Sequence, residues 1–331
     1  MNHAAPVVSI VIPSFNHAQF IGDAIRSILG QSLRDLELIV VDDASSDGSP
    51  ELLRSLPADP RLHIVCLQTN VGAPAAMNTG AARARGEFIA FCGSDDQFMP
   101  EKLARQVNLL RGRPDLAAVF THIELIDEHG TPWEPSSHPW QATFAQHNRS
   151  REAWLQRFFH EGNCLCQPSA LIRRSTFERV GRQDARLAQL HDFALWLDLL
   201  QHGDIAIIEQ PLTRYRRRRV GGSLSDGSVE SFLRVRWEWL QVLPRFLKVD
   251  PSLGAGVFGG KYTEARQRGA THSQAVALAA AINPNRWYQQ FALQTLFDTL
   301  PAAADADMAP GDHWLTGELR KLSGELDILG I

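Results

Sequence analysis

The chain has 331 residues, of which 44% are hydrophobic and 21% charged, and its formal net charge is -4. A globular protein of one large domain with an appendage, or of two domains, is expected, and the charge argues against a partner of nucleic acid. The chain begins with no signal-peptide pattern and has no apolar run near the ~20 residues that cross a bilayer, so we expect a cytoplasmic protein without a transmembrane segment, free or in peripheral contact with the inner face of the membrane.

The first part of the chain alternates between strand-like and helix-like segments. Residues 7–12 predict a strand that Pro13 ends, and Asn16 is expected to cap a helix that continues to Ile28. Later segments follow the same rhythm, with strands predicted at 36–41, 62–67 and 88–92 and helices at 50–56, 75–84 and from Pro100 onward. Continuous apolar strands between helices predict an α/β fold with a mainly parallel sheet flanked by helices.

Polar loops follow each of these strands. They contain Pro13 to Asn16, Asp42 and Asp43, Asn70 to Gly72, and Ser94 to Asp96. In parallel sheets, ligands bind beyond the carboxyl ends of the strands. We therefore expect the four loops to line one crevice.

The acidic turn Gly93-Ser94-Asp95-Asp96 is the most informative of these loops. Two adjacent carboxylates at a strand end offer hard oxygen ligands suited to Mg²⁺ or Mn²⁺. A divalent ion there can hold a diphosphate and stabilise it as a leaving group. The same letters also suit an ordinary turn, so the neighbouring motifs decide between the two.

The second half of the chain changes character twice. Residues 127–151 are irregular and rich in Pro and Trp, which is typical of either a functional flap or a surface connection. Strands are predicted at 169–173, 205–208 and 212–215, and a helix at 192–201. After residue 225 the pattern is helical, at 230–247, 261–282, 285–300 and 314–329. The expected division is a catalytic domain at 1–225 and a helical region at 226–331 that serves packing, oligomerisation or acceptor binding.

Several of these motifs, in this order, resemble a family 2 glycosyltransferase. They are the strand and loop at 8–16, the Asp-rich segment at 42–49, Asn70-Val71-Gly72, the segments at 78–82 and 86–91 that lead into Ser94-Asp95-Asp96, and the segments at 168–174, 177–181 and 191–197. The resemblance extends over roughly the first two thirds of the chain, and ordered motifs are more specific than any one alone.

The resemblance implies a GT-A fold, which is Rossmann-like, and inverting transfer of one sugar from a nucleotide-sugar, with a UDP-sugar expected. The implied cofactor is Mn²⁺ or Mg²⁺, and the acceptor hydroxyl belongs to a glycan, a lipid-linked molecule or a protein in glycan or glycoconjugate biosynthesis. Asp96 is the implied metal ligand. Asp43 can accept the ring N–H of a base, and Phe15 can stack on it. The other implied donor-binding residues are Pro13, Ser14, Asn16, Asn70, Gly72, Asn78, Ser94 and Asp95.

Asp192, at a predicted helix start, is the implied general base, and the plain alternative is that it only caps its helix. Arginines at 214 and 216–219 form a basic run, from which Arg216 and Arg218 are predicted to act in a lid over the diphosphate or to contact the acceptor. A solvated strand edge is the alternative for this run.

Two other functions stay open from the sequence. A sugar nucleotidyltransferase shares a similar sheet, but it needs a Gly-rich phosphate loop after the first strand, where this chain has Ser14-Phe15-Asn16-His17. An inactive relative that binds nucleotide or acts as a scaffold is the non-enzyme alternative, and the presence of both Asp96 and Asp192 argues against it.

Overall fold

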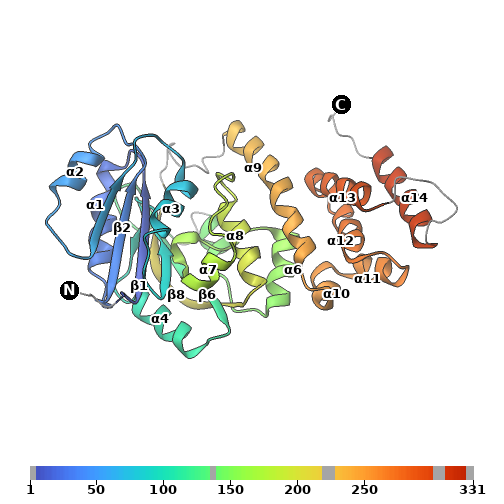
Figure 1. The fold of residues 1–331 in the computed structure, drawn as a ribbon, viewed down its shortest axis with the longest axis horizontal. Coiled ribbons are helices and arrows are strands. Elements are labelled where there is room, and N and C mark those ends of the chain that lie inside the picture. The colour runs from blue at the N-terminus through green and yellow to red at the C-terminus, as the bar shows by residue number, and fades with distance from the viewer. Residues whose placement is uncertain (1–4, 135–138, 218–227, 301–309, 326–331) are drawn as a thin grey trace. The chain divides into compact units, whose positions relative to one another are not determined.

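The computed structural model describes residues 5–134, 139–217, 228–300 and 310–325 (Figure 1). The chain forms two compact units, one of Met1–Asn148 with Cys164–Asp226 and the other of Arg149–Asn163 with Gly227–Ile331. The second unit therefore includes a segment from the middle of the chain, in addition to the C-terminal region that the helical pattern predicts.

An eight-stranded mixed sheet forms the centre of the first unit, in the order β3-β2-β1-β4-β7-β6-β8-β5. The first four strands in this order pair in parallel; they are β3 (Leu62–Cys66), β2 (Leu36–Asp42), β1 (Val8–Ser14) and β4 (Phe88–Phe91). The next strand, β7 (Leu171–Arg173), is antiparallel to both of its neighbours. The strands β6 (Leu116–Ile126) and β8 (Asp204–Arg216) pair in parallel. The last strand, β5 (Gln97–Phe98), is antiparallel to β8. The parallel half places four strand ends at one edge of the sheet.

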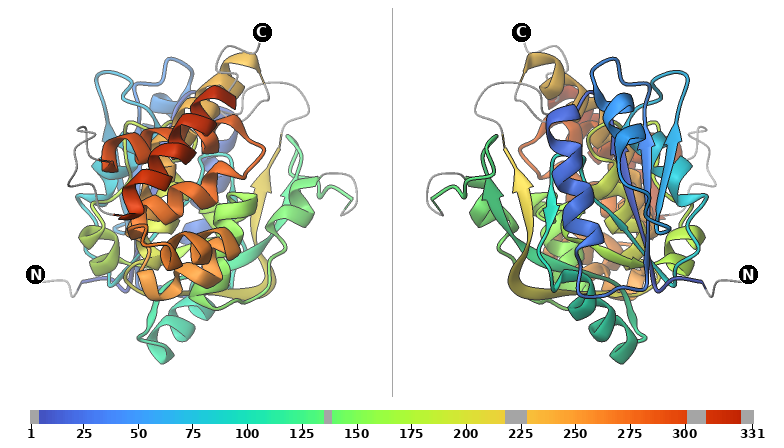
Figure 2. Two further views of the ribbon diagram at one scale, coloured as in Figure 1. Left: turned by 90° about the vertical axis from the view of Figure 1, so that its right-hand side faces the viewer. Right: turned by 90° about the vertical axis from the view of Figure 1, so that its left-hand side faces the viewer.

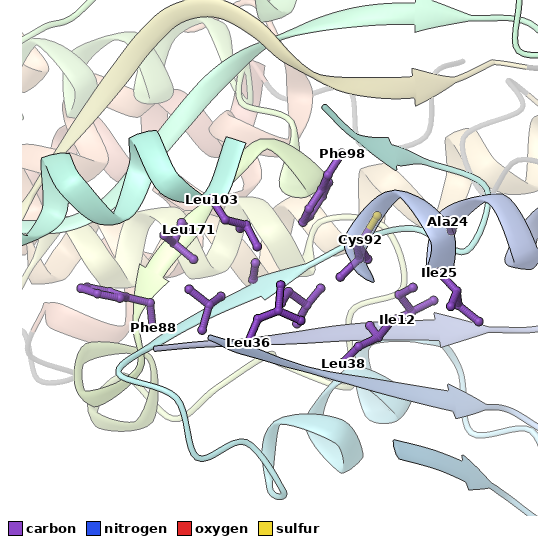
Figure 3. Close-up of a cluster of buried hydrophobic side chains, with 14 of the residues drawn as sticks. Ile12, Ala24, Ile25, Leu36, Leu38, Phe88, Cys92, Phe98, Leu103 and Leu171 are labelled. Carbon is purple, nitrogen blue, oxygen red and sulfur yellow. The ribbon is translucent and has the colours of Figure 1, made fainter. Parts of the chain in front are cut away.

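Helices cover both faces of this sheet. Figure 3 shows the core on one face, where α1 (Ala18–Leu29) and α4 (Lys102–Gly112) pack on alternate residues of β1, β2 and β4. The right-hand view of Figure 2 shows α1 along the first strands. The other helices of the unit are α2 (Ser49–Ser55), α3 (Ala73–Ala81), α5 (Pro139–Phe144), α7 (Arg174–Arg179) and α8 (His191–Leu200). Alternation of buried side chains between two covered faces explains why these strands are apolar throughout.

The sequence predicts that Pro13 ends the first strand, but β1 continues to Ser14. The carbonyl of Val11 accepts the N–H of Cys92 on the β4 side, and Pro13 faces the same side two residues later. Pairing of β1 with β4 ends at Val11. The N–H that proline lacks is therefore not needed at that point of the sheet.

The sheet also differs from the prediction in its second half. The two strands predicted at 205–208 and 212–215 are one strand, β8, whose register against β6 shifts between Ile208 and Pro211. Such an irregularity accommodates a proline within a strand. The partner strand β6 was not predicted. The stretch expected to be irregular contains α5, whose Trp140 and Phe144 pack against Tyr215.

The second unit is helical. It contains α6 (Arg151–Glu161), α9 (Val229–Val242), α10 (Gly254–Phe258), α11 (Gly260–Gln267), α12 (His272–Ala281), α13 (Arg286–Thr299) and α14 (Pro310–Glu325). Phe159 of α6 contacts the rings of Phe246, Phe258 and Tyr288, which explains why this mid-chain helix belongs to the unit.

The single helix predicted at 261–282 is two helices, α11 and α12. Gly269 has a φ of +91°, and Thr271 then begins α12 with a capping box that includes Gln274. A left-handed glycine followed by a capped start breaks a helix. Across the described residues, no helix has the length and apolar character needed to span a bilayer.

Candidate active site

The loops after β2 and β3 are joined by the buried side chain of Asp43. Its two carboxylate oxygens accept the backbone N–H groups of Val71, at 2.8 Å, and Gly72, at 2.9 Å. Gly72 has a φ of +85° directly before α3, a conformation that favours glycine. The amide of Asn70 donates to the backbone carbonyl of Asp43 at 3.4 Å. One carboxylate thus fixes the path of the chain into α3.

The prediction that Asn16 caps α1 is wrong. Oδ1 of Asn16 accepts the N–H of Ser46 at 2.8 Å, so this side chain closes the loop after β2 instead. The first N–H of the helix, that of Ala18, donates to Oδ2 of Asp47 at 2.9 Å. The cap therefore comes from a neighbouring loop, which a pattern of adjacent residues does not reveal.

Two apolar side chains adjoin Asp43. Phe15 is 45% exposed and follows Ser14, whose carbonyl accepts the N–H of Asp43, and Val71 is 48% exposed. Ser14 itself is buried next to Pro13, and its Oγ has no hydrogen-bond partner among the described residues. The strand end thus presents exposed apolar surface directly beside a buried carboxylate.

The acidic turn is held by the end of β8. The N–H of Arg216 donates to Oδ1 of Asp96 at 2.9 Å, and its Nε donates to the carbonyl of Asp95 at 2.8 Å. Oγ of Ser94 lies 2.6 Å from Nδ1 of His17, which precedes α1. Burial, followed by the charge of Asp95, raises the pKa of Asp96 well above its usual value. The charge and the backbone N–H of Arg216 act in the opposite direction but do not outweigh burial and Asp95.

The carboxylates of Asp95 and Asp96 both approach Gly93. A Cβ at position 93 would lie 2.4 Å from Oδ2 of Asp96 and 3.1 Å from Oδ1 of Asp95. The described residues contain no cluster of three or more His, Cys, Asp or Glu side chains that could hold a metal. The donor set on the protein is thus two hard oxygen ligands, which suits Mg²⁺ or Mn²⁺ when substrate phosphates and water complete the shell.

Arg216 differs from the predicted lid residue. It is buried as the last residue of β8, its guanidinium donates to the carbonyls of Asp95 and Asp127, and it lies over the ring of Phe20. Its contacts make it a support for the acidic turn. Arg218, the other predicted lid residue, lies outside the described residues.

Asp192 lies in the first turn of α8 and is partly buried. Its Oδ1 accepts the N–H of Phe193 at 2.6 Å. The thiol of Cys166 is buried, and burial is the largest cause of its raised pKa. The charges of Asp96 and Asp192 raise the same pKa further. Both carboxylates therefore lie within electrostatic reach of one thiol.

Asn78 contacts a loop that the sequence did not single out. Its Nδ2 donates to the carbonyl of Gln183 at 2.8 Å, and its Oδ1 accepts the N–H of Gln183 at 3.0 Å. Oε1 of Gln183 lies 3.1 Å from Nδ1 of His191, beside Asp192. Burial lowers the pKa of His191 to about 4, so it is neutral at pH 7. The contacts of Asn78 join residues that are far apart in the sequence, so no local sequence pattern predicts them.

Backbone strain marks the same loops. In the described part of the chain, the non-glycine residues with positive φ are Asn16 at 52°, Ala44 at 59° and Arg182 at 71°. Asn16 lies in the loop after β1, Ala44 lies in the loop after β2, and Arg182 directly precedes Gln183. Strained residues of this kind concentrate at functional sites.

Comparison with protein families matches residues 9–181 to the family described as glycosyl transferase family 2. A putative teichuronic acid biosynthesis glycosyltransferase, TuaG of Bacillus subtilis, is 33% identical over 218 residues, which cover 65% of this chain and 81% of that protein. The succinoglycan biosynthesis protein ExoO of Rhizobium meliloti is 37% identical over 122 residues, 37% of this chain and 34% of its own.

Solved structures share the fold at lower sequence identity. The S. aureus TarS 1-349 complex with UDP-GlcNAc has a TM-score of 0.58 at 15% identity, covering 87% of this chain and 80% of that one. The mannosyltransferase PcManGT from Pyrobaculum calidifontis, in complex with GDP-Man and Mn²⁺, has a TM-score of 0.51 at 18% identity, covering 96% and 81%.

Proposed function

Because the chain belongs to glycosyl transferase family 2, we propose that this glycosyltransferase moves a single sugar, with inversion, from a nucleotide-sugar to an acceptor hydroxyl. The observation that carries this proposal is a pair of carboxylates in the family's domain, the buried Asp96 held by the N–H of Arg216 and the partly buried Asp192 in the first turn of α8. One carboxylate suits the leaving group and the other suits the nucleophile.

Donor recognition is proposed at the ends of β1 to β4. The exposed ring of Phe15 stacks on the base, and Asp43 uses its remaining lone pairs to accept a ring N–H, such as the one that uracil offers. The other residues proposed to bind the donor lie in or after β1, β3 and β4 and on α3, namely Pro13, Ser14, Asn16, Asn70, Gly72, Asn78, Ser94 and Asp95. A UDP-sugar is therefore the proposed donor, as in the TarS complex.

Asp192 is proposed to act as the general base. Its Oδ1 accepts the N–H of Phe193, which fixes the carboxylate at the start of α8, and the carboxylate is proposed to accept the proton of the acceptor hydroxyl. The acceptor oxygen then forms its bond to the anomeric carbon while the bond from that carbon to the diphosphate oxygen breaks. The electron pair leaves with the diphosphate on the opposite face, so the configuration inverts.

Asp96, with Asp95, is proposed to hold Mn²⁺ or Mg²⁺. A bound divalent ion would neutralise the charge that develops on the departing diphosphate. Gly93 leaves room for both carboxylates, and the backbone N–H of Arg216, at the end of β8, orients the carboxylate of Asp96. The PcManGT complex with GDP-Man contains Mn²⁺, which supports this choice of ion.

The biological setting is proposed from the relatives. TuaG and ExoO are named for teichuronic acid and succinoglycan biosynthesis, which favours a glycan or lipid-linked acceptor over a protein. We place the reaction in the cytoplasm at the inner face of the membrane. Residues 1–225 without the segment at 149–163 would be the catalytic domain, and 226–331 together with that segment would serve packing, oligomerisation or acceptor binding.

A panel of nucleotide-sugars tests the proposal, with nucleoside diphosphate release measured in Mn²⁺ and in EDTA. Release from a UDP-sugar that needs the metal and is weakened in Asp192→Asn is the expected result. Pyrophosphate formed from a nucleoside triphosphate and a sugar phosphate would instead indicate a nucleotidyltransferase. Metal-dependent UDP binding without turnover, with every donor and a panel of glycan acceptors, would indicate an inactive nucleotide-binding relative.

A further inference from the structure

Gln183 connects two helices that carry different parts of the proposed site. Its backbone N–H and carbonyl are both bonded to the side chain of Asn78 on α3, at 3.0 and 2.8 Å. Its side chain extends the other way, with Oε1 3.1 Å from Nδ1 of His191 at the start of α8. A single residue thus spans from the helix that follows Gly72 to the helix that carries Asp192.

The contact with His191 also fixes the state of that imidazole. A carboxamide oxygen can only accept a hydrogen bond, so Nδ1 of His191 carries the proton. His191 is 7% exposed, and burial keeps it neutral. The neutral imidazole therefore adds no positive charge next to Asp192.

The segment around Gln183 is costly to fold, which argues against a purely structural role. Gly181 follows the end of α7 with a φ of +90°, which glycine adopts without strain, but Arg182 after it has a φ of +71°, which does cost a non-glycine residue free energy. Gln183 is 3% exposed, and its Nε2 has no hydrogen-bond partner among the described residues. A strained backbone and an unpaired buried amide both lower stability, and such features persist where function maintains them.

We propose that Gln183 is a positioning residue that fixes the first turn of α8, and with it Asp192, relative to α3. This inference rests on the proposed function, because it takes Asp192 as the base. Displacement of a catalytic group by about 1 Å can cost about a hundredfold in rate. The backbone bonds to Asn78 do not depend on the side chain of Gln183, so the contact with His191 can be removed separately.

Gln183→Met tests the inference, since it keeps an unbranched side chain of similar length and removes the carboxamide. The matched control is Gln201→Leu, which removes the bond from Nε2 to the carbonyl of Leu197 at the other end of α8. In Gln183→Met the unpaired Nδ1–H of His191 offsets the removal of the unpaired Nε2, so we expect a melting temperature close to that of the wild type, a kcat lower by about tenfold or more, and a donor KM within about twofold. The control is expected to retain its kcat.

A kcat that stays at the wild-type level, or a kcat that falls together with the melting temperature, would overturn the inference. Hydrogen exchange of the first turn of α8 gives a readout that does not need a known donor: exchange should be faster in Gln183→Met than in the control, and equal exchange would also overturn it. The kcat of Asp192→Asn separates a failure of the positioning role from a failure of the base assignment. If that variant is impaired while Gln183→Met is not, only the positioning role fails; if Asp192→Asn keeps the wild-type kcat, the base assignment fails.

Discussion

Arg216 at the end of β8 orients Asp96 through its backbone N–H, which donates to Oδ1 at 2.9 Å. This contact makes the acidic turn dependent on a strand 120 residues later in the chain. The other oxygen, Oδ2, faces Gly93 with Asp95 beside it. The carboxylate of Asp96 is thus held by a backbone contact on one side and has room on the other because Gly93 has no side chain.

Gly93→Ala should damage the metal site more than the fold. A methyl group 2.4 Å from Oδ2 of Asp96 displaces a carboxylate that is buried and held by Arg216. We expect the affinity for Mn²⁺ to fall by about tenfold or more, at a cost of about 1–3 kcal/mol in the free energy of unfolding. Gly112→Ala is the control, because a Cβ there meets nothing within 4 Å. Titration with Mn²⁺ measures the difference, and equal affinity in both variants would contradict this picture of the turn.

Asp96→Asn should change how stability depends on pH and on metal. The pKa of Asp96 is raised in the folded protein, so the folded state holds this proton more tightly than the unfolded state, and that stabilisation is lost as pH rises through the folded pKa. The neutral variant should therefore be more stable than the wild type in EDTA, by a larger margin at pH 8 than at pH 5.

Melting temperatures at both pH values, with and without Mn²⁺, check this expectation. Mn²⁺ should raise the melting temperature of the wild type, more strongly at pH 8, and should leave Asp96→Asn unchanged. An equal shift in both proteins would place the metal elsewhere.

Asp192→Asn should reduce turnover without changing donor binding. The amide oxygen of Asn can still accept the N–H of Phe193, so the first turn of α8 is retained. Loss of a general base lowers kcat by about 10²–10⁴-fold. Single-turnover kinetics and UDP titration separate the two effects. Asp198→Asn on the same helix is the control, and a comparable loss in that variant would remove the special role of Asp192.

His191 should make the protein less stable in mild acid. Burial lowers its pKa to about 4 from the ordinary value of 6.5, so between these pH values the unfolded chain binds a proton that the folded protein does not. Stability is therefore lost as pH falls from above 6.5 towards 4, by about 2 kcal/mol at pH 5. Urea unfolding of the wild type and His191→Phe at pH 7.5 and pH 5 measures this contribution. The variant should lose less stability between the two pH values than the wild type, and equal losses would refute the assignment.

The parallel half of the fold follows from its sequence because hydrophobicity dominates there. Residues such as Ile10 and Val40 are buried on strands covered on both faces, and such strands are apolar throughout. The antiparallel half is less regular. In β6, Glu124 is only partly buried and Thr121 bonds to Thr213 of β8, so polar side chains interrupt the pattern, and Pro211 divides β8 in sequence although not in space.

The candidate site shows the same contrast between local and distant signals. The loop that carries Asp43 and the acidic turn follow directly from strands that the sequence predicts. The support for them does not, since Asp47 caps α1 across a loop and Gln183 binds Asn78 from 105 residues away. Lys102 is a further case, because a charged residue that a pattern places at the surface is buried, with Nζ bonded to Gln106. Tertiary contacts decide these positions, and a single sequence carries little record of them.

The anomeric configuration of the transferred sugar tests the central claim most directly. Proton NMR can follow the first minutes of transfer, or of slow hydrolysis, with an α-linked nucleotide-sugar in the presence of Mn²⁺. A single displacement assisted by Asp192 predicts that the β-anomer forms first. Initial formation of the α-anomer would contradict it, because retention requires a different mechanism from the one in which Asp192 deprotonates the attacking hydroxyl.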